Sequence, residues 1–280
     1  MPFADTPLRD EYAAAVERVA GRTLDALRGA GGAVALADPA ADPAADPAAG
    51  PAAGPLAGRG AGLEPPRPLL AALRVLGPDL FAPQLLGGAA PDEPTALLLA
   101  EAHRVFPPAG LAQGGDGNAV VTAWRDWAAG VLLVRALGTA PSEAPPEDGR
   151  GERSVTAPAP TAVPGHAAWP EPEQWQAWSI RMAQLSALAL PGLDGAVHRQ
   201  ARGHALALAR GTVRSMLRRD HRAAARLVRW LAWCRAEGVA VPLELRPLLA
   251  RLQVVSDGSA RIALELAIAT ALLDTAEGRA

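Results

Sequence analysis

The side chains with the most capacity for chemistry in this sequence are arginines concentrated in one segment, residues 195–235. This segment contains ten arginines and one acidic residue, Asp220, so its formal charge is +9. Residues 1–94 instead contain seven arginines and twelve acidic residues, which gives a formal charge of −5. A guanidinium group binds carboxylates and phosphates through paired hydrogen bonds. The separation of charge therefore indicates a surface in the C-terminal half that binds an anionic partner.

The arginines fall on one face of each of two expected helices, residues 195–219 and 221–237, when residues are placed at intervals of about 100°. Trp233 departs from the amphipathic pattern because it projects into the arginine face, one turn from Arg229. An indole among guanidinium groups can stack on a nucleic-acid base or anchor a protein contact. The residues predicted to bind a partner are Arg210, Arg214, Arg218, Arg222, Arg226, Arg229 and Trp233.

A plainer interpretation of the same segment is a pair of amphipathic helices with solvated polar faces. The chain contains no lysine, so all 27 basic residues are arginine. Together with the high alanine, glycine and proline content, this indicates codon bias in a GC-rich genome, and we expect a bacterial, actinobacterial source. The number of arginines then says little about binding. In this interpretation Trp233 covers a neighbouring helix, and Arg229 stacks on its ring.

A second pattern with catalytic potential joins Arg199 to His204 through four intervening residues. The spacing R-x4-H, with the polar Gln200 after the arginine and an expected helical bundle around it, resembles the catalytic motif of HEPN ribonucleases. The resemblance implies that Arg199 and His204 act on the phosphate and on proton transfer at an RNA 2′-hydroxyl, without a metal ion. It covers six residues. The alternative interpretation is two surface residues on an arginine-rich helix.

Other catalytic and ligand-binding signatures do not occur in the sequence. The lack of lysine excludes a P-loop, and neither G-x-S-x-G nor H-E-x-x-H is found. The five histidines do not have the spacing of metal ligands, since His198 and His204 would lie about 120° apart on a helix. The single Cys234 excludes a multi-cysteine metal site. We therefore expect neither a metal site nor a cofactor.

The fold class predicted is all-α, a helical bundle or a short helical-repeat array with linkers rich in proline, alanine and glycine. Apolar residues recur at three- to four-residue steps outside these linkers. Helix ends are marked by the cap residues Asp220 and Ser259 and by glycines such as Gly29 and Gly238. The predicted parts are an N-terminal amphipathic helix (1–29), a disordered linker (30–62), a region of short helices (63–138), a second disordered linker (139–170) and a C-terminal helical bundle (171–280).

Composition also bears on the location of the protein. No run of about 18 apolar residues occurs, so no membrane span is predicted. The first residues carry acids where a secretory signal would carry basic residues. The net charge of −2 argues against a chain that coats nucleic acid or membrane with its whole surface. We expect a cytoplasmic location.

These observations support a leading hypothesis and two alternatives for function. The first is a non-enzymatic bacterial adaptor or regulatory protein that works by protein–protein contact or self-association through the Arg/Trp face. The second is a nucleic-acid-binding helical module that uses the same face, although the continuous periodicity of residues 195–219 lacks the turn of a helix-turn-helix. The third is a HEPN-like, metal-independent ribonuclease.

Overall fold

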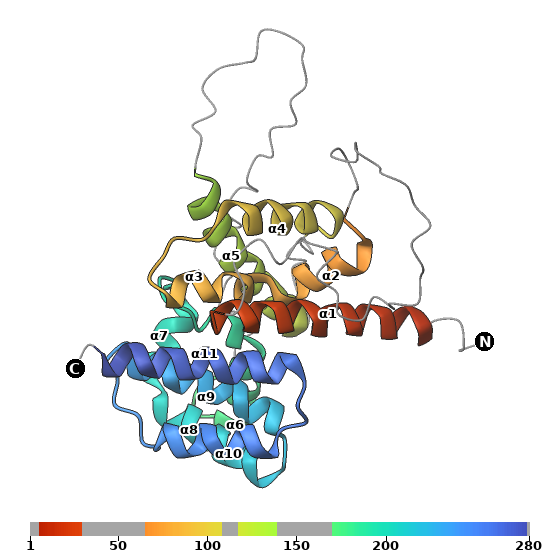
Figure 1. Ribbon diagram of the computed structural model, residues 1–280. Coiled ribbons are helices and arrows are strands. Elements are labelled where there is room, and N and C mark those ends of the chain that lie inside the picture. The colour runs from red at the N-terminus through yellow and green to blue at the C-terminus, as the bar shows by residue number, and fades with distance from the viewer. Residues whose placement is uncertain (1–5, 30–64, 108–116, 139–169, 279–280) are drawn as a thin grey trace, which may run out of the picture.

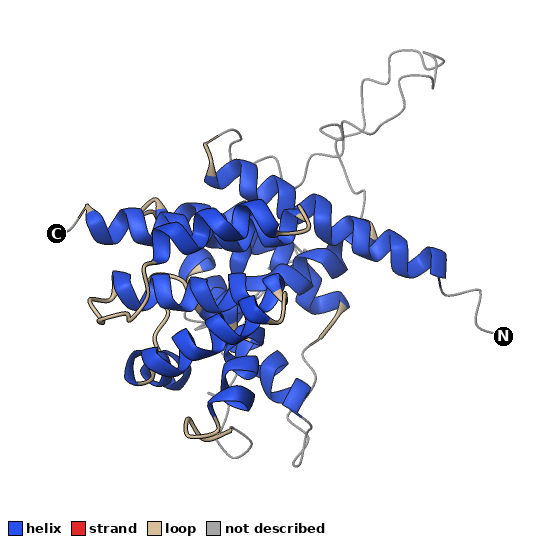
Figure 2. Cartoon of the chain, turned by 90° about the horizontal axis from the view of Figure 1, so that it is seen from below, coloured by secondary structure: helices blue, strands red, loops and turns tan. Residues whose placement is uncertain are grey.

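The chain is helical throughout the part that the computed structural model describes, residues 6–29, 65–107, 117–138 and 170–278. No strand occurs within these ranges (Figure 2), which confirms the all-α prediction. Apart from Pro170, the two predicted linkers lie outside the described residues. The elements are α1 (Thr6–Leu27), α2 (Arg67–Leu76), the 3-10 helix η3 (Gly77–Phe81), α3 (Ala82–Leu86), α4 (Glu93–Val105), α5 (Gly117–Leu137), α6 (Trp175–Gln184), the 3-10 helix η4 (Ser186–Leu188), α7 (Ala196–Gly203), α8 (Ala205–Leu217), α9 (His221–Ala236), α10 (Leu245–Val255) and α11 (Ala260–Glu277).

The helices form an upper group, α2 to α5, and a lower group, α6 to α11, with α1 lying along α11 between them (Figure 1). In the upper group α4 packs on α2 and α5, and in the lower group α9 contacts α6, α8, α10 and α11. The buried apolar side chains make one continuous cluster with members from α1 to α11. The region of short helices therefore packs directly on the C-terminal bundle, a question that periodicity alone leaves open.

Local sequence signals account for three of the helix ends, the starts of α9 and α11 and the end of α9. Asp220 accepts a hydrogen bond from the amide of Ala223 (3.0 Å), and the hydroxyl of Ser259 accepts one from the amide of Ile262 (3.3 Å). These two contacts satisfy amides that a helix N-terminus leaves without a partner. Gly238 follows α9 with a φ of 78°, a conformation that favours glycine. The predicted caps at Asp220 and Ser259 are confirmed.

The segment predicted as one helix over residues 195–219 is two helices, α7 and α8, and the prediction of a continuous helix was wrong. His204 leaves helical geometry with φ −128° and ψ 36°. Asp194, just before α7, forms an ion pair with Arg202 (2.7 Å). Arg199 on α7 is therefore not in helical register with the arginines of α8, because the break at His204 interrupts the helix between them.

A glycine allows α6, α8 and α9 to approach one another closely. Gly211 is buried in α8, and a Cβ atom added there would lie 2.8 Å from the Oγ of Ser179 and 3.2 Å from a methyl carbon of Leu227. The Cβ of Ser179 would be closer still, and a side-chain stem cannot rotate away.

We expect Gly211→Ala to lower the free energy of unfolding by about 1–3 kcal/mol, because overpacking outweighs the better helix propensity of alanine. Chemical denaturation followed by circular dichroism measures this loss. Gly203→Ala is the matched control, since a Cβ there meets nothing within 4 Å. If the two variants were equally stable, α6 and α8 would not be in close contact at Gly211.

One stretch of the described residues, Arg67–Leu86, is long and apolar enough to cross a membrane by length and composition. It is divided among α2, η3 and α3, and 56% of its most apolar 18-residue window is buried inside the protein. Leu70, Leu73 and Phe81 from this stretch lie in the hydrophobic core. Its apolar character is accounted for by packing against α1, α4 and α5.

Candidate functional site

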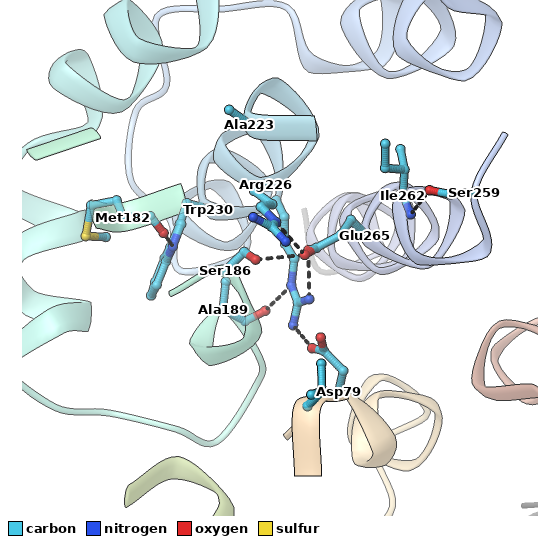
Figure 3. Close-up of polar contacts among 12 residues, drawn as sticks. Asp79, Met182, Ser186, Ala189, Ala223, Arg226, Trp230, Ser259, Ile262 and Glu265 are labelled. Atoms are coloured by element: carbon cyan, nitrogen blue, oxygen red, sulfur yellow. Dashed lines mark hydrogen bonds and ion pairs between the residues drawn. The ribbon is translucent and has the colours of Figure 1, made fainter. Parts of the chain in front are cut away.

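Arg229, predicted to lie on an exposed face, is 0% exposed, and that prediction was wrong. Its Nη2 donates to Oδ1 of Asp79 (2.7 Å) and its Nη1 donates to Oε2 of Glu265 (3.0 Å), as Figure 3 shows. Its Nε donates to the carbonyl oxygen of Ala189 (3.3 Å). The physical reason is that α9 is packed against α6, α7, α8, α10 and α11, so only a narrow part of its surface is left for solvent.

The two carboxylates keep this buried arginine charged. Burial opposes its charged form, but the charges of Asp79 and then Glu265 raise the pKa of Arg229 above its ordinary value. Burial likewise opposes the ionised form of Glu265. The charges of Arg229 and Arg226 and a hydrogen bond from Ser186 (2.8 Å) nevertheless lower the pKa of Glu265. The network joins η3 of the upper helices to α9 and α11 of the lower ones.

Trp233 is also buried, with 1% of its surface exposed, so its predicted position in an exposed arginine face was wrong. Its ring packs against His198 of α7 (5.1 Å between centroids) and edge-on against Trp230 (5.6 Å). The guanidinium that lies over Trp233 belongs to Arg202 (5.3 Å) rather than to Arg229. Trp233 thus covers a neighbouring helix, as the plainer interpretation holds, with a different arginine on its ring.

The other two arginines of α9 that were predicted to bind a partner differ in exposure. Arg226 is largely buried, and its Nε lies 3.5 Å from Oε1 of Glu265. Arg222 is exposed. The face predicted on this helix is therefore not a continuous surface. The basic surface that the structure does present lies on α8, where Arg210, Arg214 and Arg218 are all exposed.

These three arginines line a groove with a volume of about 640 Å³. We call it the α8 groove. Its walls come from α6, from α8 with its C-cap residue, and from the loop between α9 and α10. The lining residues are Trp175, Leu206, Ala209, Arg210, Val213, Arg214, Leu217, Arg218, Pro242 and Leu243.

The α8 groove combines an apolar strip with a basic strip. Leu206, Val213 and Leu217 are large apolar side chains left exposed on α8, and at about 100° per residue they lie within an arc of about 40°. The three arginines follow on one side of this strip. Arg214 lies over the ring of Trp175, with its Cζ 5.9 Å from the ring centroid. No acidic residue is found among the residues that line the groove.

The sequence therefore predicted the basic half of this site and missed the apolar half. Leu206 and Leu217 lie beside the arginines in the sequence, but their exposure depends on which other helices cover α8, and a helical pattern does not show this. Pro242 and Leu243 lie more than twenty residues further along the chain, and Trp175 more than thirty before Leu206. No local pattern brings them to α8.

The structure places the HEPN-like pair on either side of a helix break. Arg199 is exposed on α7, whereas the ring of His204 packs edge-on against the buried Trp178 (5.9 Å between centroids). Within the described residues, no hydrogen bond joins the two side chains, and no group of three or more His, Cys, Asp or Glu residues is placed to hold a metal ion. Cleavage of RNA by Arg199 and His204 remains a prediction.

Comparison with protein-family models, with curated proteins and with solved structures found no match to this chain. Its function must therefore be inferred from its own geometry.

Proposed function

We propose that this protein is a non-enzymatic adaptor or regulatory protein that binds an acidic, amphipathic segment of a partner protein in the α8 groove. The observation that carries this proposal is the pairing of exposed Leu206, Val213 and Leu217 with a row of three exposed arginines in one groove. Large apolar side chains left in contact with water in this arrangement are typical of a binding surface.

Charge complementarity supports an acidic partner. The lining residues carry three positive charges and no negative charge. A second copy of this chain that docked groove to groove would bring two sets of three arginines together, which opposes symmetric self-association at this site. A segment with apolar anchors and flanking carboxylates satisfies both strips, in the manner of a helix laid into a groove.

The apolar strip favours a protein over a nucleic acid as the occupant. A phosphate backbone would be bound by the three arginines of the groove, but it offers nothing to cover Leu206 or Leu217. Trp175 alone could stack on a base. A nucleic acid would therefore contact mainly the basic strip of the groove, whereas an acidic, amphipathic protein segment would contact both the basic and the apolar strip.

We expect Arg214→Glu/Arg218→Glu to reduce retention of the partner about tenfold or more, because each reversal replaces an attraction by a repulsion. The measurement is affinity capture from a lysate of the source cells with the full chain as bait, read by quantitative mass spectrometry. Arg199→Glu is the matched control, since Arg199 is an exposed arginine outside the groove.

Capture alone does not support the proposal. The protein that the wild type retains and the double variant loses must also bind the purified protein through an acidic segment. A set of captured proteins that is the same for the wild type and the double variant would overturn the proposal. If the bait instead retained nucleic acid, seen as absorbance at 260 nm that a high-salt wash removes, the result would favour a nucleic-acid-binding module.

A further inference from the structure

The N-terminal end of α1 projects beyond the rest of the protein. Figures 1 and 2 both show this end of the helix extending past the helices beside it. In residues 7–14 Tyr12 is half-buried and the other side chains are exposed, and Ala15 is the first buried residue among the described side chains of α1. Leu8 is 53% exposed. Helices in proteins gain most of their stability from packing, so an uncovered end of this kind is stabilised by a partner that covers it.

The projecting end of α1 is amphipathic and carries acidic side chains. At about 100° per residue, Leu8 and Tyr12 lie on the same side of the helix as Ala15, which belongs to the hydrophobic core. The apolar stripe of α1 therefore continues past the part that the protein itself covers. Glu11 lies at one edge of this stripe. Residues 7–14 contain two carboxylates and one guanidinium group, which gives a formal charge of −1.

The projecting end is held away from the α8 groove of its own chain. α1 packs on α2, α3 and α11, and none of these helices lines the groove. Ala15, Val19 and Leu24 fix the rest of α1 in the core, and the helix is continuous from Thr6 to Leu27. A continuous helix bends only gently, so its first turns cannot fold back onto another face of the same molecule. The projecting end is instead free to meet a second copy of the chain.

We propose that residues 7–14 of one copy occupy the α8 groove of a second copy. The inference rests on the proposed function, because it takes the α8 groove as the binding surface and names the protein's own α1 as a segment that fills it. The stripe of Leu8 and Tyr12 covers the apolar strip of the groove, and Glu11 faces the row of arginines beside that strip. Two surfaces that one chain leaves exposed are thus complementary in polarity and in charge.

The contact joins two different surfaces, so it is a head-to-tail contact. It differs from groove-to-groove pairing, which the arginines oppose, because a helix with a net negative charge meets a groove with three positive charges. Each copy in a pair still has one groove and one helix end, and these either dock reciprocally or add further copies. The small contact area predicts a weak association that depends on concentration.

The test is sedimentation velocity of the full chain from about 5 µM to about 300 µM, a range suited to weak association. The wild type is expected to show a mass that rises with concentration. Leu8→Glu alters only the helix end and Leu217→Glu only the groove, and each variant alone is expected to associate at least tenfold more weakly. Both side chains are exposed, so neither change disturbs the core. Val254→Glu, 79% exposed on α10 and outside the groove, is the matched control and is expected to associate as the wild type does.

An equal mixture of Leu8→Glu and Leu217→Glu gives the sharpest result. One intact helix end then meets one intact groove, so the mixture is expected to form a dimer and no larger species, although each variant alone stays a monomer. A wild type that is monomeric at every concentration, a variant that associates as the wild type does, or a mixture without a dimer would overturn the inference. The proposed function would survive any of these results if the wild type captured another acidic protein that Arg214→Glu/Arg218→Glu loses.

Discussion

Replacing Asp79 by alanine is expected to lower the free energy of unfolding by about 3–5 kcal/mol, the usual cost of leaving one member of a buried ion pair without its partner. Arg229 is fully buried, and Asp79 is the carboxylate that approaches its Nη2 most closely. After the substitution Glu265 alone would balance Arg229, and Glu265 is already shared with Arg226. The loss is measured by denaturant unfolding at neutral pH.

Two further variants separate the loss of a buried partner from a general effect of removing charge. Asp274→Ala removes an exposed partner of Arg246 and is expected to cost about 0–1 kcal/mol. Asp79→Asn keeps an oxygen acceptor for Arg229 and is expected to cost less than Asp79→Ala. If Asp79→Ala were no more destabilising than Asp274→Ala, η3 would not be joined to α9 through this pair.

Stability is expected to fall by about 2 kcal/mol between about pH 7 and pH 5, largely through His198. Burial, opposed by the hydrogen bond between Nε2 and the carbonyl oxygen of Leu188 (2.9 Å), lowers the pKa of His198 from 6.5 to about 4. Asp194 acts to raise this pKa and Arg202 to lower it. The Nδ1 atom is buried and has no hydrogen-bond partner, so a proton added there would have no acceptor.

The direction of this pH dependence follows from when His198 takes up a proton in the folded and in the unfolded chain. Above pH 6.5 His198 is neutral in both the folded and the unfolded chain, so it contributes no dependence on pH. Between 6.5 and about 4 the unfolded chain takes up a proton that the folded chain does not, and the free energy of unfolding falls as the pH falls. The loss reaches about 3 kcal/mol below pH 4, at about 1.4 kcal/mol per pKa unit.

His198→Gln keeps a donor for Leu188 and removes the titration, so most of the loss between pH 7 and pH 5 should disappear. Carboxylates titrate below this window, which keeps the comparison specific to histidine. His103 is also buried with a lowered pKa, and it contributes with the same sign. An unchanged pH dependence in His198→Gln would show that the ring is accessible to protons in the folded protein.

The sequence predicted those parts of the fold that are decided locally. The caps at Asp220 and Ser259 and the glycine after α9 involve residues within a few positions of one another, so their chemistry is visible in the sequence. The break at His204 is different. The residues around it continue the arginine-rich helical pattern, and the turn is accompanied by packing of His204 on Trp178, which is 26 residues earlier in the chain.

The candidate site was predicted only in part, because some of its features depend on contacts between residues that are far apart in the chain. Arg210, Arg214 and Arg218 were identified because they share one side of α8. Arg229 resembles them in spacing, but its carboxylate partner Asp79 is 150 residues away in the chain. A helical wheel does not show which polar residue meets a buried partner, and so it assigned Arg229 and Trp233 to the surface.

The central proposal is that an acidic partner segment occupies the α8 groove, and site-specific photo-crosslinking tests it most directly. A photo-reactive phenylalanine derivative replaces Leu217 in the groove or Val254 on α10, which are 80% and 79% exposed and so are equally accessible. We expect irradiation of the full chain in source cells to give a protein adduct at position 217 only, with the crosslinked peptide rich in acidic and apolar residues. Equal adducts at both positions, no adduct at 217, or an adduct to nucleic acid would contradict the proposal.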